Sequence, residues 1–313
     1  MMALVIPIAI LAGVLLVGPM LTFVERRLLA LFQDRYGPNR VGPFGLFQLL
    51  ADAIKMFFKE DWIPPFSDKV VFVIAPIIIM ATTLLGFVVV PVSPGFVILD
   101  SSIGLLIFFA ISSLGSYSLV LGGWSSNNKY ALMGGLRGAA QVLSYEVFMG
   151  LSLMGVVALA GSFRIQDIVE AQSNCWNIVP QFLGFCVFFI AALAETHRLP
   201  FDLPEAEGEL VAGFHSEYSG MKFGMFFIGE YIGVMLMSAM MVLLFLGGWK
   251  GPFLAPIVWF LLKTFLLIGV YILIRAATPR PRYDQLINFG WKWMLPISLA
   301  NLVATGAYVV FVG

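Results

Sequence analysis

The residues best suited to proton chemistry lie in one polar stretch, Glu195–Phe223, with the sequence ETHRLPFDLPEAEGELVAGFHSEYSGMKF. This stretch separates two long apolar runs in a chain of 313 residues that is 60% hydrophobic and only 12% charged. It contains six carboxylic acids: Glu195, Asp202, Glu205, Glu207, Glu209 and Glu217. Membranes tolerate such groups near their interior only where protein or water surrounds them. The pattern therefore indicates a path for protons or cations.

The spacing of these acids suggests that some of them repel one another. In a helical turn, Asp202, Glu205 and Glu209 would share one face, and Glu207 would point elsewhere. Like charges held close together raise one another's pKa, so we expect at least one acid of the loop to hold a proton near neutral pH.

Three more ionisable residues lie within the apolar runs themselves. Glu230 follows the acidic loop, Glu146 lies in QVLSYEVFMG, and Lys263 lies within a later run. One interpretation is a structural ion pair between Lys263 and either glutamate. Buried pairs stabilise poorly because desolvation offsets their attraction. Carboxylates without a full cationic partner have raised pKa values, which suits groups that load and release protons near neutral pH.

The elements that must position these residues are membrane-spanning helices. The content of 29 Phe and 15 Met, with the long apolar runs, is typical of a polytopic all-α membrane protein. We expect a single integral membrane domain over residues 1–313, without a soluble domain or a cleaved signal peptide. Eight segments have the length and hydrophobicity of spans: residues 2–24, 70–92, 101–121, 139–161, 178–194, 221–247, 254–274 and 291–312.

The basic residues predict the orientation of these spans. Most of the 18 Lys and Arg residues fall in the loops 25–69, 122–138, 195–220 and 275–290 or at span edges beside them. By the positive-inside rule these loops face the cytoplasm, or the matrix in an organelle. Both termini are then expected on the outer, periplasmic side.

The first of these loops contains an amphipathic segment at about residues 44–60. It follows the turn sequence DRYGPNRVGP, and its leucine and phenylalanine residues recur at helical spacing, with Asp52 and Lys55 on the other side. The segment is too polar to span a membrane. It either lies in the membrane interface, or its polar face docks a soluble partner or lines an entrance at headgroup level. These two interpretations are compatible.

Other chemistry finds little support in the sequence. Cys175 and Cys186 show no metal-binding or redox spacing, and the chain has no CxxC, Walker A or GxGxxG motif. We therefore expect no metal, iron–sulfur, nucleotide or flavin site in this chain, and no nucleic-acid partner. His197 and His215 are lone histidines in the acidic loop, for which a structural role and a proton relay are both open.

Several long motifs together resemble one family. They are ERRLLALFQDRYGPNRVGPFG (25–45), KEDWIPPFSD (59–68), GWSSNNKYALMGGLR (123–137), LSYE (143–146), AETHRLPFDLPEAEGELVAGFHSEYSGMKF (194–223) and RPRYDQL (280–286). The chain resembles, over nearly its whole length, the H subunit of proton-pumping NADH:quinone oxidoreductase. This enzyme is respiratory complex I, and the mitochondrial counterpart of the subunit is NADH dehydrogenase subunit one.

The resemblance implies a membrane-arm subunit with quinone as substrate and no redox cofactor or catalytic residue of its own. FMN and iron–sulfur clusters would belong to partner subunits. Expected partners are two peripheral quinone-site subunits, small membrane subunits and antiporter-like subunits. The membrane would be the bacterial cytoplasmic (inner) membrane, or the mitochondrial inner membrane. Quinone would enter from the lipid between the first span, the amphipathic helix and the sixth span.

The resemblance also implies roles for individual residues. It places six beside the quinone chamber or its entrance: Glu25, Arg26, Arg27, Arg35, Asp52 and Lys55. It places the others along an acidic, water-filled proton path toward the antiporter-like subunits: Glu146, Glu195, Asp202, Glu205, Glu207, Glu209, Glu217, Glu230 and Lys263.

Two other functions remain open on the sequence. A secondary transporter or ion channel also uses intramembrane acids, although the chain shows no internal repeat of the kind found in such folds. The membrane subunit of a related hydrogenase complex would bind no quinone. The RYGPNRVGP turn and the PEAEGELVAGFHSEYSG loop favour the quinone enzyme.

Overall fold

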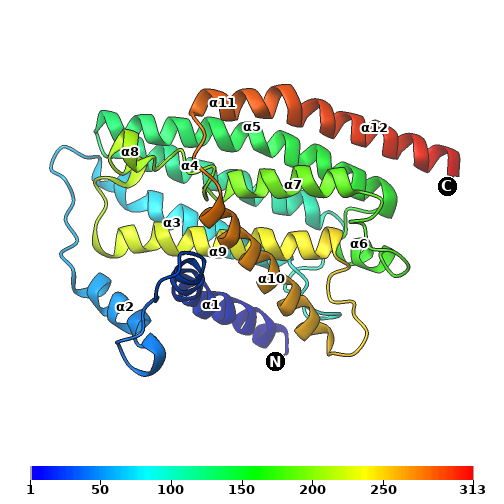
Figure 1. Ribbon diagram of the computed structural model, residues 1–313, viewed down its shortest axis with the longest axis horizontal. Helices are drawn as coiled ribbons and strands as arrows, with labels where there is room; N and C mark the ends of the chain where they lie inside the picture. The colour runs from blue at the N-terminus through cyan, green and yellow to red at the C-terminus, as the bar shows by residue number, and fades with distance from the viewer. Residues whose placement is uncertain (1, 313) are drawn as a thin grey trace.

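The computed structural model describes the backbone of residues 2–312 and the side chains of residues 5–206 and 208–311. Within this range the chain is a bundle of helices (Figure 1). The α-helices are α1 (Met2–Phe32), α2 (Gln48–Phe58), α3 (Lys69–Gly86), α4 (Gly104–Ser125), α5 (Lys129–Ala160), α6 (Ile165–Ala171), α7 (Phe182–Glu195), α8 (Glu207–Leu210), α9 (Gly220–Phe245), α10 (Pro256–Ala277), α11 (Tyr283–Phe289) and α12 (Leu295–Val312).

The helices confirm the prediction of an all-α polytopic membrane protein. Among the described residues, seven helices are long and apolar enough to cross a membrane. The segment predicted at 178–194 forms the shorter apolar helix α7, with 14 residues. The last span is continuous with α11 through a π-helical turn, Gly290–Met294.

Two helices extend well beyond the predicted spans. α1 continues to Phe32, so Glu25, Arg26 and Arg27 lie on its last turns and not in a loop. α5 begins at Lys129, where the side chain of Asn128 accepts a hydrogen bond from the backbone N–H of Tyr130. With 32 residues, α5 is about 48 Å long, which exceeds the ~30 Å hydrocarbon core of a bilayer. Its N-terminal turns therefore reach the end of the bundle where the acidic loop lies.

An amphipathic helix forms within the predicted segment 44–60. A 3₁₀ turn, Pro43–Gly45, precedes α2, which packs against α1 and α9. Leu50, Ile54 and Phe58 are exposed on its outer side. An exposed apolar stripe of this kind is typical of a helix lying in a membrane interface.

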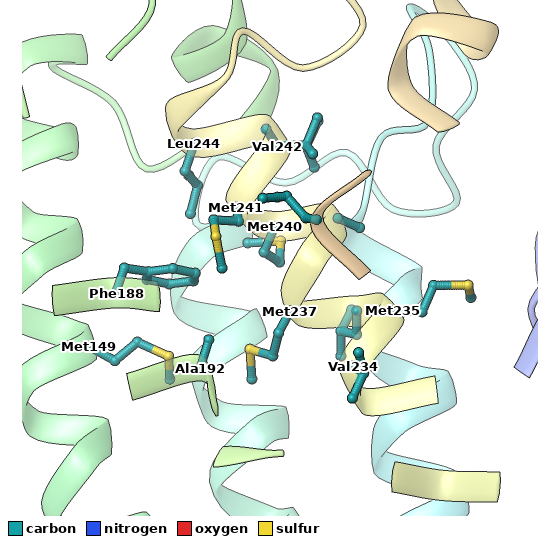
Figure 2. Close-up of a cluster of buried hydrophobic side chains, with 14 of the residues drawn as sticks. Met149, Phe188, Ala192, Val234, Met235, Met237, Met240, Met241, Val242 and Leu244 are labelled. Atoms are coloured by element: carbon teal, nitrogen blue, oxygen red, sulfur yellow. The ribbon is translucent and has the colours of Figure 1, made fainter. Parts of the chain in front are cut away.

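Helix α9 is the centre of the bundle. It packs against α1, α2, α3, α6, α7 and α10. From Glu230 to Phe245 every residue except Gly233 is buried. The half of α9 far from the acidic loop is rich in methionine, and Figure 2 shows Met237, Met240 and Met241 beside side chains of neighbouring helices.

The acidic loop, residues 196–219, folds back onto the bundle end and contains only α8 and a 3₁₀ turn, Gly213–His215. The loop lies at one end of the bundle, and α6 and the C-terminus lie toward the other (Figure 1). The buried side chain of Gln141 on α5 holds the start of the loop, because its amide donates to the carbonyl oxygens of Ala194 and Phe201 at 2.7 and 2.8 Å. Gly213 has φ +59°, and a Cβ there would overlap the carbonyl oxygen of Pro204.

Candidate functional site

Three acids of the proposed proton path meet where the acidic loop touches α9. Asp202 and Glu205 come from the loop and Glu230 from α9. The carboxyl group of Glu205 lies within hydrogen-bonding reach of both Asp202 and Glu230. Asp202 also accepts a hydrogen bond at 2.7 Å from Arg280, which follows α10. The structure thus brings together acids that are far apart in the sequence.

Burial shifts the pKa values of two residues of the loop, Asp202 and His197. Burial, followed by the nearby Glu205, raises the pKa of Asp202 to about 7, although Arg280 opposes this shift. Asp202 therefore changes its charge near neutral pH, as expected for at least one acid of the loop. Burial lowers the pKa of His197 to about 4, so this imidazole is neutral at neutral pH. Its Nδ1 atom has no hydrogen-bond partner among the described residues.

A cavity connects Glu230 to Glu195, one of a second pair of acids. Its volume is about 60 Å³, and its walls include Glu195, His197 and Glu230. Hydroxyl groups from α3, α4 and the residue after α7 also line it: Thr82, Thr83, Ser112, Ser116 and Thr196. A polar cavity with several hydrogen-bonding groups is suited to hold water.

Glu195 and Glu146 form the second pair. Glu195 ends α7, Glu146 lies on the neighbouring α5, and their carboxylates are close enough to repel each other. Within the described part of the chain, Oε1 of Glu146 and Oε2 of Glu195 have no hydrogen-bond partner. Of the two acids, Glu195 lines the cavity, and Glu146 lies behind it on α5.

Lys263 pairs with neither glutamate, so the structural ion pair considered from the sequence does not form. Its Nζ atom donates instead to the backbone carbonyl oxygens of Leu246, Gly248 and Lys250, at 2.7, 3.0 and 2.8 Å. These carbonyls lie beyond the C-terminal end of α9, at the end of this helix far from the acidic loop. The structure therefore does not bring Lys263 together with the acids of the loop.

A buried arginine, Arg198, lies between an acid of α1 and an acid of α9. Its guanidinium lies 3.8 Å from Glu25 and 3.8 Å from Glu230, and 4.1 Å from the centre of the Tyr231 ring. Glu25 is also paired with Arg275 of α10. The sequence analysis did not assign Arg198 to the site. The signal was present, because Arg198 is the one Lys or Arg residue in the acidic loop 195–220.

A second cavity lies between α1, α2 and α9, where the resemblance placed the quinone entrance. Its volume is about 100 Å³, and most of its lining is apolar. The charged residues in its wall are Arg26 and Asp52, which form an ion pair at 2.7 Å. The amide of Gln48 also donates to Asp52, at 3.1 Å.

The other residues assigned to the quinone chamber lie elsewhere. Glu25 faces Arg198 and Arg275, on a different side of α1 from Arg26. Lys55 lines a neighbouring cavity that Lys59 also lines. Two more arginines lie apart from both cavities: Arg27 lies 5.8 Å from the ring centre of Phe23, and Arg35 is exposed and donates to Gln33.

The remaining acids of the loop divide according to their partners. Glu209 is exposed and pairs with Arg137 at 2.7 Å, and Glu217 accepts a hydrogen bond from Asn128 at 2.8 Å. Glu205 and Glu209 do not share a helical face, because α8 begins only at Glu207 and is preceded by Ala206 with φ +31°. The side chain of Glu207 lies outside the described residues.

Among the described residues, no group of three His, Cys, Asp or Glu side chains is placed to hold a metal ion. The site consists of carboxylates, one buried arginine and a cavity with room for water.

Comparisons with known proteins identify the family of this chain. The family model for NADH dehydrogenase matches residues 4–306. A curated relative, the H subunit of the NADH-quinone oxidoreductase of Methylococcus capsulatus (strain ATCC 33009 / NCIMB 11132 / Bath), is 64% identical over 301 residues, which cover 96% of this chain and 95% of the relative. On these two matches, the chain belongs to the NADH dehydrogenase family of integral membrane proteins that includes the H subunit of NADH-quinone oxidoreductase.

Proposed function

We propose that this chain forms the quinone entrance and the first part of the proton path in a proton-pumping NADH:quinone oxidoreductase. The family membership supports the enzyme. The observation that carries the local assignment is one ionic chain, in which Arg198 lies between Glu25 on α1 and Glu230 on α9. These three ionic side chains connect α1, which borders the entrance cavity, to α9, which borders the acidic cavity.

The cavity between α1, α2 and α9 fits the entrance of a long apolar substrate. A quinone has an isoprenoid tail and a polar head group, and the cavity has a largely apolar wall with one ion pair, Arg26–Asp52. The exposed apolar stripe of α2 would hold this helix at the membrane surface. The tail would then enter from the lipid, and the ion pair would meet the head group.

A change of charge at the entrance would alter the protonation of the acids deeper in the bundle. Both contacts of Arg198 are longer than a direct hydrogen bond, so its guanidinium is shared between Glu25 and Glu230. A change of charge near Glu25 would draw Arg198 toward or away from that acid. Glu230 would then lose or gain its cation, and would bind or release a proton accordingly. Glu205 and Asp202 continue the path to the loop, and the water cavity continues it to Glu195.

The proposed positions of the quinone chamber and the proton path imply where the partner subunits would bind. Two peripheral subunits would cover the acidic loop and complete the quinone chamber, and other peripheral subunits would hold FMN and the iron–sulfur clusters. Small membrane subunits and antiporter-like subunits would receive the proton path laterally. The loops rich in Lys and Arg would face the cytoplasm and both termini the periplasm, in the bacterial cytoplasmic (inner) membrane or the mitochondrial inner membrane.

The two other functions considered from the sequence are less well supported. A related hydrogenase subunit would need no quinone entrance, whereas the printed name of the 64% identical relative is that of a quinone enzyme. A stand-alone transporter would not share nearly the whole chain with a subunit of a larger enzyme.

The variant Glu230→Gln tests the proton path. It preserves the volume of the side chain and removes its exchangeable charge. We expect quinone reduction and membrane potential to fall strongly in vesicles that contain the assembled enzyme, while NADH oxidation by a hydrophilic acceptor is retained. The matched control is Glu170→Gln, because Glu170 is exposed on α6, at the other end of the bundle, and belongs to neither cavity. Wild-type quinone reduction and potential in Glu230→Gln would mean that this carboxylate has only a structural role.

A further inference from the structure

Beyond the acidic cavity, α9 is buried and, from Ala239 onward, apolar; we call Met240–Phe245 the dry segment because none of its side chains carries an N–H or O–H group. The lining of that cavity reaches Leu236 and Met237 on α9 and ends there. All six residues of Met240–Phe245 are apolar and have 0% exposed surface, even in the absence of any partner subunit. Met149 of α5 and Phe188 of α7 lie beside this segment (Figure 2).

The C-terminal end of this dry segment has its backbone fully hydrogen-bonded. The last carbonyl groups of a helix have no partner within the helix and normally attract water. Here protein groups take them. The side chains of Gln172 and Asn177 donate to the carbonyl oxygens of Leu243 and Leu244 at 2.8 and 2.9 Å. The backbone N–H of Ile178 donates to the carbonyl oxygen of Phe245 at 2.9 Å.

Lys263 closes this end with its ammonium group. Its ammonium group binds the next carbonyl oxygens along the chain, those of Leu246, Gly248 and Lys250. It lies 4.4 Å from the ring centre of Trp176, and the residue is 7% exposed. Within the described residues, no carboxylate lies within ion-pair distance of it. Carbonyl oxygens at a helix C-terminus, like those that bind Lys263 here, are a favourable site for a cation.

We infer that Met240–Phe245 and Lys263 form an insulating seal that stops protons in the Glu230 cavity from crossing to the α6 side of the membrane. We call these residues the α9 seal. Proton transfer needs titratable groups or ordered water, and the dry segment has neither a titratable side chain nor a polar one to hold water. The charge of Lys263 adds electrostatic repulsion for any proton or cation that approaches from the far side. The inference rests on the proposed proton path and adds that this path has no exit through the outer half of α9.

The first test is the variant Lys263→Met, which removes the charge and three hydrogen bonds but retains most of the side-chain volume. In vesicles with the assembled enzyme at rest, we expect the passive proton leak to rise several-fold, measured with a pH-sensitive dye after an acid pulse. The control Lys250→Met removes an exposed ammonium group from the same region, one that binds the carbonyl oxygen of Glu170. We expect wild-type leak in this control. An assembled Lys263→Met enzyme that is as tight as the wild type would overturn the proposal.

A second test does not depend on assembly of Lys263→Met. Ser238 is fully buried between the acidic cavity and the dry segment, and Ser238→Cys is nearly isosteric. A membrane-impermeant methanethiosulfonate reagent is added from the α6 side, and modified peptides are identified by mass spectrometry. The native Cys175 is exposed in the loop after α6 and reports access of the reagent. We expect Cys175 to react and the cysteine at 238 to remain unmodified.

The two failures can be told apart. Reaction at position 238 from the α6 side would overturn the seal, whatever the effect of Glu230→Gln. A silent Glu230→Gln variant with an intact barrier would overturn the proton path and leave the insulation of this half of the bundle in place.

Discussion

Arg198 is the residue whose environment is least explained by structural stability alone. It is buried, and its Nε and Nη2 atoms have no hydrogen-bond partner among the described residues. A guanidinium group has five N–H donors, and leaving donors unpaired in a buried place is unfavourable. Two acids share its charge without a short contact to either. An arrangement of this kind has more than one position of similar energy, which is what a charge-sensitive connection between the two acids requires.

Two substitutions of Arg198 should therefore separate the effect of its positive charge from the effect of the guanidinium shape. Arg198→Gln leaves Glu230 without its cation, and removing one partner of a buried pair costs about 3–5 kcal/mol. We expect less assembled enzyme and, per assembled enzyme, quinone reduction lowered by more than an order of magnitude. Arg198→Lys retains the charge, but a lysine cannot span two carboxylates or stack on Tyr231 in the same way, so an intermediate rate is expected.

The control for this prediction is Arg282→Gln. Arg282 is an exposed arginine with a contact of 3.6 Å to the exposed Asp284, and we expect no effect beyond small changes. Rates are normalised to the NADH oxidation by a hydrophilic acceptor. Arg198→Gln with the same normalised rate as Arg282→Gln would remove Arg198 from the mechanism.

At the scale of helices, the direction in which a side chain leaves its helix decides whether two residues predicted for one site do lie at that site. Successive residues on a helix point about 100° apart. Glu25 and Arg26 are neighbours on α1, so their side chains leave the helix in different directions, and here they lie on different sides of it. The resemblance placed both beside the quinone, and the sequence did not predict that α1 continues to Phe32. Had that boundary been known, the periodicity would have divided them.

Other parts of the site could not be read from the sequence for a different reason. The spans, the amphipathic helix and the density of acids follow from composition and periodicity, which one chain displays. The partners of Lys263 are backbone carbonyl groups, and every residue carries one, so no side-chain pattern marks them. The contact of Asp202 with Arg280 joins residues 78 positions apart and depends on how the loop folds.

The helix α2 offers a prediction about its polar face. The pair Arg26–Asp52 is partly exposed, so we expect it to contribute about 0–1 kcal/mol to stability. Reversing the charge in Arg26→Glu should leave the enzyme assembled and lower quinone reduction several-fold, with normal NADH oxidation by a hydrophilic acceptor. Lys55→Glu should have a smaller effect, because Lys55 lines the neighbouring cavity.

The exchanged pair Arg26→Asp with Asp52→Arg shows what the ion pair does. If the pair only holds α2 against α1, the exchange restores quinone reduction. If the cation meets the quinone head group at its present position, the exchange restores little. Equal loss of both activities in Arg26→Glu, with the enzyme assembled, would argue against an entrance at this cavity.

At the scale of the whole molecule, much of the apolar surface is exposed on the outside of the bundle. α12 contacts the bundle through a polar clamp, in which the buried Gln181 binds Thr305 at 2.6 Å and Asn301 at 2.7 Å. Its other side is exposed and apolar, with Val303 and Val310 at 70% and 79% exposure. Lipid or neighbouring membrane subunits must cover this surface. The polar loops at the other end carry the acids and basic residues that peripheral subunits would cover.

This division predicts the behaviour of the chain alone. Because the sequence has no flavin, nucleotide or iron–sulfur motif, the isolated chain in detergent or vesicles should neither oxidise NADH nor reduce quinone. A tagged copy in its native membrane should instead co-purify with a multi-subunit enzyme that contains flavin and iron–sulfur clusters. The measurement is mild detergent extraction, followed by native electrophoresis, cofactor spectra and NADH:quinone activity in the tagged fraction. The control is the same extraction from cells with an untagged copy. Recovery of the chain as a single, active ion transporter without flavin would contradict its assignment as a subunit, because all of its chemistry would then reside in one bundle.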